Sequence, residues 1–131
     1  MGMYLDNSVG YGLMVPYTDD EFDGDLPQEW EALVEKYDGD TQAIFEDLLE
    51  DYEGLAYDIT YYTDYSGPAV IFVDALSTSH GGFGAVRLTD KVLNLDTFEH
   101  DKKLLEIAYN IGMPTLTAAR SVGIWSVVSY G

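Results

Sequence analysis

The sequence predicts an α+β fold, with one antiparallel sheet of four to five strands and three helices packed on one face. The first observation behind this is size and composition: 131 residues, 47% of them hydrophobic and 14% aromatic, suffice to bury a single core. The second is periodicity, because apolar residues alternate along some segments and recur at helical spacing along others. The third is that no internal repeat or low-complexity segment is present. We therefore interpret residues 1–131 as one globular domain.

The N-terminal segment is predicted to be a strand followed by a loop. Its apolar run begins at Val9 and stops at Pro16, as is typical of a strand. Gly10 and Gly12 within this run weaken the strand or mark a β-bulge. Residues 18–25 are rich in acidic residues and are predicted to be the loop.

Two acidic helices are predicted over residues 26–37 and 41–52. Asp25 is expected to cap the first helix, with Pro27 in its first turn. The break at residues 38–40 ends the first helix and caps the second, and Gly54 is a natural residue to follow the second helix. The expected core stripes are Leu26, Trp30, Leu33, Val34 and Tyr37 in the first helix and Ile44, Phe45, Leu48, Leu49 and Tyr52 in the second.

The second half of the chain is predicted to return to the sheet, add a helix and end in a strand. Residues 55–62 and 69–76 read as a hairpin, joined by a turn at 66–68. A small-residue loop over 77–84, a short strand over 85–88 and a turn at 89–91 follow. The residues from Asp96 to Glu99 form a capping box that opens the third helix, which Gly112 and Pro114 end. Its inward residues are expected to be Leu104, Leu105, Ile107, Ala108 and Ile111, and the last strand spans 122–130.

Charge is distributed very unevenly along the chain. The net charge is -18, from 24 acidic and 6 basic side chains. Residues 19–53 hold 15 acids and one base, which gives -14, whereas the other 96 residues carry only -4. Acidity that served general solubility, or solvation in a salt-loving organism, should be spread over the whole surface. Such solvation stays an alternative interpretation, because lysine is scarce and the 15 Asp outnumber the 9 Glu. Acids also stand at the end of the second predicted helix, where they oppose the helix macrodipole, so we expect the charge to serve a function.

Several classes of chemistry are excluded by the residue inventory. With no cysteine, the chain has no disulfide, thiolate metal site or cysteine nucleophile, and it fits a reducing compartment. Only His80 and His100 could act as histidine bases, and Ser79, a chain neighbour of His80, is poorly placed to form a triad with it. No G-x-S-x-G elbow or phosphate-binding glycine loop is present. We therefore predict that the protein is not an enzyme and has no cofactor.

A metal site is not expected either. The acidic loop begins like a calcium-binding EF-hand, but counting Asp19 as position 1 puts Trp30 at position 12, where a bidentate glutamate is required. We expect at most weak, nonspecific binding of divalent ions. No apolar run approaches the ~20 residues of a membrane span, and residues 1–16 lack the basic region of a secretory signal. The protein is expected to be cytoplasmic and to bind neither membranes nor nucleic acid directly, because its charge repels both.

Two groups of residues are candidates for binding a partner. The first is the set of carboxylates in the acidic helical segment 19–53: Asp19, Asp20, Glu21, Asp23, Asp25, Glu29, Glu31, Glu35, Glu46, Asp47, Glu50, Asp51 and Glu53. The second is a tyrosine cluster on one predicted strand and its turn, because exposed tyrosines are favoured at interfaces: Tyr57, Tyr61, Tyr62 and Tyr65. Ordinary amphipathic strand residues are the alternative interpretation of the tyrosines.

The two ends of the chain resemble small proteins of tailed bacteriophages. The resemblance is carried by residues 8–16, Ser-Val-Gly-Tyr-Gly-Leu-Met-Val-Pro, and by residues 123–131, Gly-Ile-Trp-Ser-Val-Val-Ser-Tyr-Gly. It covers under a fifth of the chain and carries no catalytic residue across. It implies a protein made in the host cytoplasm during infection, where small acidic proteins often inhibit DNA-handling defences.

These observations lead to three hypotheses. The first is a non-enzymatic acidic protein that imitates nucleic acid and occupies the basic nucleic-acid-binding groove of a host protein or defence enzyme, because a surface of negative charges can compete for the same Lys and Arg side chains. The alternative is a self-associating structural or accessory phage protein that uses its tyrosine-rich sheet as the interface. The third is a protein that binds or sequesters a small ligand.

Overall fold

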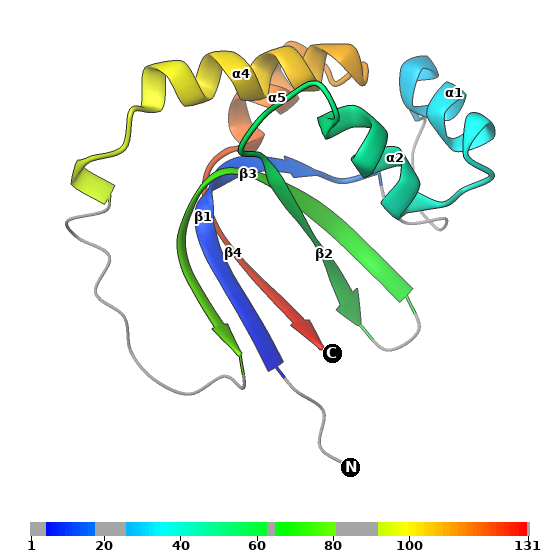
Figure 1. The fold of residues 1–131 in the computed structure, drawn as a ribbon. Coiled ribbons are helices and arrows are strands. Elements are labelled where there is room, and N and C mark those ends of the chain that lie inside the picture. The colour runs from blue at the N-terminus through cyan, green and yellow to red at the C-terminus, as the bar shows by residue number, and fades with distance from the viewer. Residues whose placement is uncertain (1–4, 18–25, 63–64, 81–91, 131) are drawn as a thin grey trace.

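The computed structural model describes residues 5–17, 26–62, 65–80 and 92–130 (Figure 1). It confirms the α+β class, with a four-stranded antiparallel sheet in the order β2-β3-β1-β4 and, among the described residues, four helices. The elements in chain order are β1 (Leu5–Val15), α1 (Gln28–Lys36), α2 (Thr41–Leu49), β2 (Ala56–Tyr62), β3 (Tyr65–His80), α4 (Thr97–Asn110), α5 (Thr115–Ser121) and β4 (Val122–Tyr130).

The sheet is strongly bent rather than flat. The pairing of β1 with β3 shifts register between Val9 and Gly10 and again between Tyr11 and Gly12, so the glycines predicted to weaken the strand or mark a bulge do lie at irregularities. Bulges bend the strands that carry them, and Figure 1 shows β1 and β3 curving together. As a result the edge strands β2 and β4, which share no ladder, approach within 8 Å between Cα atoms.

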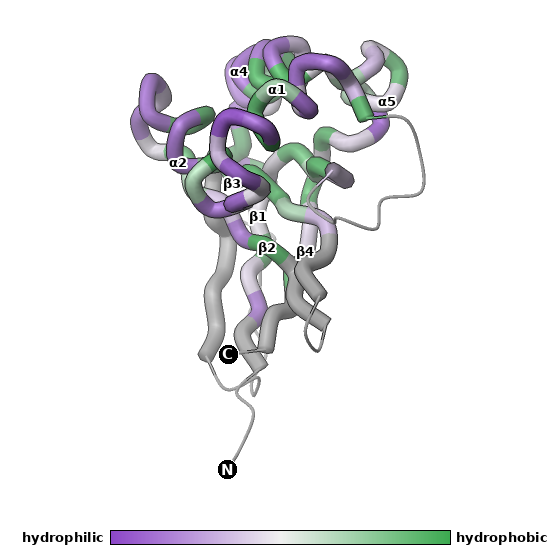
Figure 2. The backbone as a smooth tube through the Cα atoms, turned by 90° about the vertical axis from the view of Figure 1, so that its right-hand side faces the viewer, coloured by the Kyte–Doolittle hydropathy of each residue, from purple (hydrophilic) through white to green (hydrophobic). Residues whose placement is uncertain are grey.

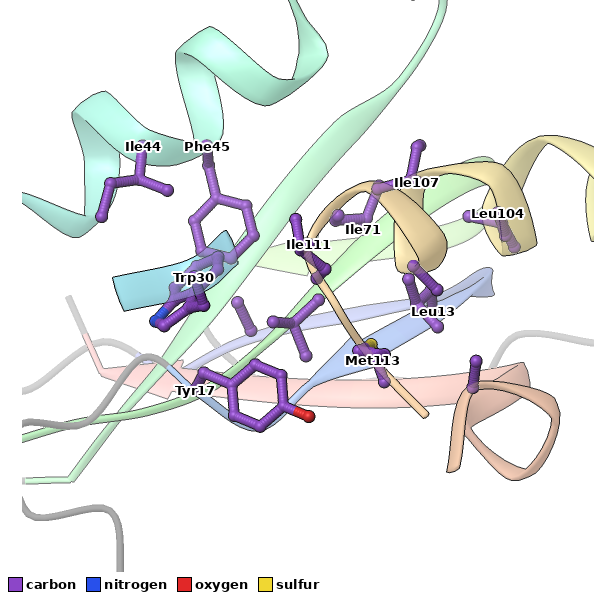
Figure 3. Packing of buried hydrophobic residues seen from close by; sticks show 14 of the residues in the cluster. Leu13, Tyr17, Trp30, Ile44, Phe45, Ile71, Leu104, Ile107, Ile111 and Met113 are labelled. Carbon is purple, nitrogen blue, oxygen red and sulfur yellow. The ribbon is translucent and has the colours of Figure 1, made fainter. Parts of the chain in front are cut away.

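The main core lies between the helices and one face of this sheet (Figure 3). Trp30 of α1 and Phe45 of α2 have ring centroids 5.9 Å apart, and Phe45 in turn stacks on Tyr57 of β2 at 5.1 Å. From α4 the buried residues are Leu104, Ile107 and Ala108. The helical stripes predicted from spacing therefore do supply the core, with one exception at residue 105 that is described below.

A second, smaller apolar cluster occupies the opposite face of the sheet. Val70, Phe72 and Val127 are buried there, with Met14 and Trp125 packed against them. Gly12 pairs with Phe72 across the ladder and with Gly123 on its other side. A Cβ on Gly12 would collide with the carbonyl oxygen of Ile71, so the close approach of β1 and β3 requires glycine at this position.

The helix ends follow ordinary capping chemistry. The Asp40 carboxylate accepts from the backbone N–H of Ala43 at 3.3 Å, and the Asp96 carboxylate accepts from that of Glu99 at the same distance. At the end of α4, the N–H of Met113 bonds the carbonyl of Ala108 around Gly112, which has a φ of 80°. This is a Schellman arrangement, as the Gly112 stop signal predicts. Helix α1 begins after Pro27 without a side-chain cap, and the predicted cap, Asp25, lies outside the described residues.

Three sequence predictions differ from the structure. Residues 66–68, predicted to be a turn, belong to β3, which begins at Tyr65. Residues 77–80, predicted to be part of a loop, continue β3 and pair with the polar start of β1. Helix α5 was not predicted, because seven residues rich in threonine and alanine carry no apolar stripe. The short strand and turn predicted over 85–91 lie outside the described residues.

Candidate protein-binding surface

The acidic residues of α1, α2 and the loops beside them lie largely on the outside of the molecule. Glu31 and Glu35 of α1 and Glu46 of α2 are exposed, and so are Glu50, Asp51 and Glu53 after α2. Figure 2 shows hydrophilic residues, in purple, alternating with apolar ones, in green, along these two helices. The cause is local: the apolar residues of each helix turn toward the core, which leaves the remaining positions to solvent.

Glu29 and Asp47 have closer neighbours than the other carboxylates of this segment. The Glu29 carboxylate lies over Gly112 at the turn between α4 and α5, so that a Cβ there would collide with it. Asp47 is only half exposed and pairs with Lys36 at 4.0 Å between Oδ2 and Nζ, at the junction of α1 and α2. This contact is at the outer limit of an ion pair and is largely solvated, so it contributes little to stability.

Counter-charges are scarce across this surface. Residues 28–53 contain ten acids and the single base Lys36, a net charge of -9. Within the described part of the chain, Lys36 with Asp47 is the one ion pair found. The last turn of α2 contains no basic residue, and Glu50 occupies its C-cap position. Carboxylates at the negative end of a helix dipole are unfavourable for folding, so this segment is not optimised for stability alone.

Two carboxylates on α4 instead receive hydrogen bonds from tyrosine hydroxyls. The hydroxyl of Tyr11, on β1, donates to Asp101. Burial, with a further contribution from this bond and from the Asp101 charge, raises the pKa of Tyr11 to about 12. The hydroxyl of Tyr52 donates to Glu106 at 3.3 Å, and burial together with the Glu106 charge raises the pKa of Tyr52. His100 lies beside the first pair, with its ring centroid 6.0 Å from that of Tyr11.

The four tyrosines predicted as an interface are only partly described. Tyr57 is half buried and stacks on Phe45, so its ring belongs to the edge of the main core. Tyr61, Tyr62 and Tyr65 stand in the ladder between β2 and β3, where Tyr62 pairs with Tyr65. Their side chains lie outside the described residues, as do Asp19, Asp20, Glu21, Asp23 and Asp25 of the acidic set.

The sequence prediction missed an apolar surface on α4. Leu105 was expected to point inward but is 39% exposed, because the inward arc of the helix is filled by Leu104, Ile107, Ala108 and Ile111. Phe98 and Tyr109 are exposed on the same helix at 76% and 82%. Their spacing was a usable signal, since residues 98, 105 and 109 recur at helical intervals apart from the core stripe.

Searches for other kinds of site and for relatives gave three results. Among the described residues, no group of three or more His, Asp or Glu side chains is arranged to hold a metal ion. No helix in the described ranges is long and apolar enough to cross a membrane. Comparison with protein-family models, curated proteins and solved structures finds no match.

Proposed function

We propose that this protein is a non-enzymatic acidic binding protein whose carboxylate-bearing helices occupy a basic groove on another protein in place of nucleic acid. The groove would belong to a restriction enzyme, a CRISPR effector or another nucleic-acid-binding protein of a bacterial host. The host setting rests on the resemblance of the two chain ends to tailed-phage proteins.

The observation that carries this proposal is the lack of compensation on α1 and α2. Ten carboxylates and one lysine occupy residues 28–53, and most of these carboxylates are exposed. A basic groove that normally contacts phosphates gains much of its affinity from Lys and Arg, which an array of exposed carboxylates can engage instead. The unfavourable charges at the end of α2 are consistent with acidity retained for binding.

Self-association through the tyrosine-rich sheet receives less support. One of its four tyrosines, Tyr57, stacks on Phe45 and contributes to the core.

The first experiment should therefore address the acidic helices. The full-length protein, immobilised on a resin, would be exposed to bacterial lysate at low salt, and bound proteins would be eluted with duplex DNA or with mononucleotides at equal phosphate concentration.

We expect a basic nucleic-acid-binding protein to be retained and then released by duplex DNA but not by mononucleotides. Raising the salt concentration should weaken retention steeply, because contacts of this kind resemble phosphate contacts in their salt dependence. Nucleic-acid mimicry would be contradicted if the retained proteins are not eluted by duplex DNA, or if mononucleotides elute them equally well.

A further inference from the structure

Helix α4 carries a second apolar stripe that faces away from the core. Phe98, Leu105 and Tyr109 are spaced seven and four residues apart, so they share one face of the helix, with Lys102 between them. Phe98 and Tyr109 are 76% and 82% exposed. Large side chains exposed together on one helix face mark an interaction site more often than scattered single residues do.

Further exposed apolar residues stand in the chain before and after α4. Val92 and Leu93, which precede the helix, are 38% and 76% exposed, and Leu116 of α5, which follows it, is 63% exposed. In Figure 1, α4 lies along the outer edge of the helical layer, so this face is directed away from the sheet. We call these residues the α4 surface: Val92, Leu93, Phe98, Lys102, Leu105, Tyr109 and Leu116.

Charge distinguishes the α4 surface from the acidic helices. Within α4 the acids Glu99, Asp101 and Glu106 and the bases Lys102 and Lys103 leave a net charge of -1, against -9 for residues 28–53. Lys102 is exposed and makes no ion pair within 4.0 Å among the described residues. This nearly neutral surface does not favour the basic partner that the acidic helices would attract. It suits a partner that presents a carboxylate beside apolar side chains.

Helix α4 is itself such a partner. We infer that two copies of this chain associate through the α4 surface, with the two α4 helices antiparallel about a two-fold axis. When Lys102 is placed opposite Leu105 of the second copy, Phe98 falls opposite Tyr109, which pairs an aromatic ring with another at each end. In this register Leu105 of the second copy lies opposite Lys102 of the first, so Glu106 of the second copy is one residue further along its helix. Glu106 and Lys102 lie on the same side of the apolar stripe of α4. In an antiparallel pair of helices, that side of one copy faces the same side of the other copy.

The same antiparallel arrangement matches the ends of the surface. It directs the end of one copy that bears Leu93 toward the end of the other that bears Leu116, so each end of the helix pair has exposed apolar residues nearby from both copies. Each copy places its Glu106 near Lys102 of the other copy, a lysine that makes no ion pair with the described residues of its own chain. The surface is therefore self-complementary, as an interface between identical copies must be.

This inference goes beyond the proposed function, because it concerns a different surface. Salt should also have opposite effects on the two kinds of association. Two copies that each carry -18 repel one another, and salt screens that repulsion while leaving apolar contact intact. Salt should therefore strengthen the dimer, whereas it should weaken binding to a basic groove. Failure of one proposal leaves the other standing.

The test is sedimentation equilibrium of the full-length chain over a range of protein concentrations, at low and moderate salt. We expect a reversible monomer–dimer equilibrium that shifts toward dimer as salt rises. Phe98→Ala and Tyr109→Ala should each raise the dimer Kd by about tenfold or more, because large aromatic side chains carry much of the binding energy of an interface. Because both side chains are mostly exposed, the circular dichroism of the variants should stay unchanged, as should their melting temperature at concentrations well below the dimer Kd.

Charge reversal tests the antiparallel register. Glu106→Lys, which also removes the acceptor of the Tyr52 hydroxyl, should weaken the dimer although it lowers the net negative charge. Two controls should not weaken it: Tyr52→Phe, which removes that hydrogen bond alone, and Glu31→Lys, which changes the charge equally on exposed α1. Lys102→Glu should also weaken the dimer, and combining Lys102→Glu with Glu106→Lys should restore it. A monomer under all conditions, a dimer indifferent to the two aromatic variants, or a double variant without recovery would each overturn the inference.

Discussion

In this chain tyrosine hydroxyls pair with carboxylates, as lysine and arginine side chains do in most proteins. With 24 acidic and 6 basic side chains, few carboxylates can find a cationic partner. Tyr11 and Tyr52 instead donate hydrogen bonds from their hydroxyl groups to Asp101 and Glu106. Each bond ties α4 to another part of the fold without adding positive charge. Part of the high tyrosine content, eleven in 131 residues, is thereby explained by folding rather than by an interface.

Removal of the Tyr11 hydroxyl tests this role. Tyr11→Phe should lower the free energy of unfolding by about 1.5 kcal/mol at neutral pH, because a hydrogen bond to a charged acceptor is lost. Tyr109→Phe is the matched control: Tyr109 is 82% exposed, so its variant should keep full stability. Urea denaturation followed by circular dichroism measures both changes, and equal stabilities for the two variants would argue against the Tyr11–Asp101 bond.

The raised pKa of Tyr11 also predicts a pH dependence. Its ordinary pKa is 10.0 and its pKa in the folded protein is about 12, so between these values the unfolded chain loses the proton that the folded chain keeps. The stability that Tyr11 contributes is complete below pH 10 and declines as the pH rises toward 12. We expect the decline of stability over this interval to be shallower in Tyr11→Phe than in the wild type. A parallel decline in both proteins would show that the hydroxyl does not titrate as described.

At the scale of elements, the sequence predicted those segments whose local chemistry and tertiary role agree. Helix α2 combines an aspartate cap with an apolar stripe, and α4 combines a capping box with a glycine stop; both formed close to their predicted bounds. Strands β2 and β4 were found where alternation and apolar content indicated them, and the predicted hairpin of β2 with β3 is present. In each case pattern and end signals indicate the same element.

The start of β3 depends on its pairing with β2 rather than on local turn signals. Ser-Gly-Pro at residues 66–68 resembles a turn, yet β3 passes through it because Tyr61 pairs with Ser66 and Ile59 with Ala69. Gly67 and Pro68 thus lie opposite a single residue of β2, which is a β-bulge. A bulge tolerates proline, because the residue there does not have to donate a backbone N–H to the ladder. On the other side, the pairing of β1 with β3 ends at Val15 opposite Ala69, one residue after Pro68. Sequence spacing could not show either fact.

The pairing of β1 with β3 leads to an element-scale prediction. Gly12→Ala should destabilise the protein by about 2–3 kcal/mol, because the added methyl group meets the Ile71 carbonyl of the neighbouring strand. Gly123, which pairs with Gly12 from β4, has nothing within 4 Å of an added Cβ. Gly123→Ala should therefore leave stability unchanged or raise it by about 0.5 kcal/mol. Thermal and urea unfolding of the two variants compare them directly, and similar losses in both would contradict the close β1–β3 approach.

At the scale of the whole molecule, the helices present two kinds of surface. The carboxylates of α1 and α2 were identifiable from the sequence, because acidic residues between apolar stripes must face water. The α4 surface was not predicted, because Leu105 was assigned to the core stripe although its spacing from Phe98 and Tyr109 also fits a second stripe; its exposure in the structure supports the second assignment. The pairing of Asp47 with Lys36 likewise depends on how α1 and α2 meet.

The central claim is that the acidity of α2 is retained for binding at some expense of stability. Glu46→Gln with Glu50→Gln tests it best, because both side chains are exposed on one helix face and Asp47, which pairs with Lys36, stays intact. The control, Asp58→Asn with Glu99→Gln, removes the same number of charges from β2 and α4. Removing Glu50 from the C-terminal end of α2 relieves an unfavourable dipole interaction of about 0.3–1 kcal/mol.

The decisive measurement is the affinity of these two variants for the DNA-displaceable protein captured from lysate, by calorimetry at low and moderate salt, beside their unfolding free energies. We predict that the α2 variant is as stable as the wild type or more so, yet binds more weakly and with a shallower salt dependence. The control should bind nearly as the wild type does. If the α2 variant keeps wild-type affinity and salt dependence, the carboxylates of α2 are only a solvated surface, and the account of an acidic binding protein is wrong.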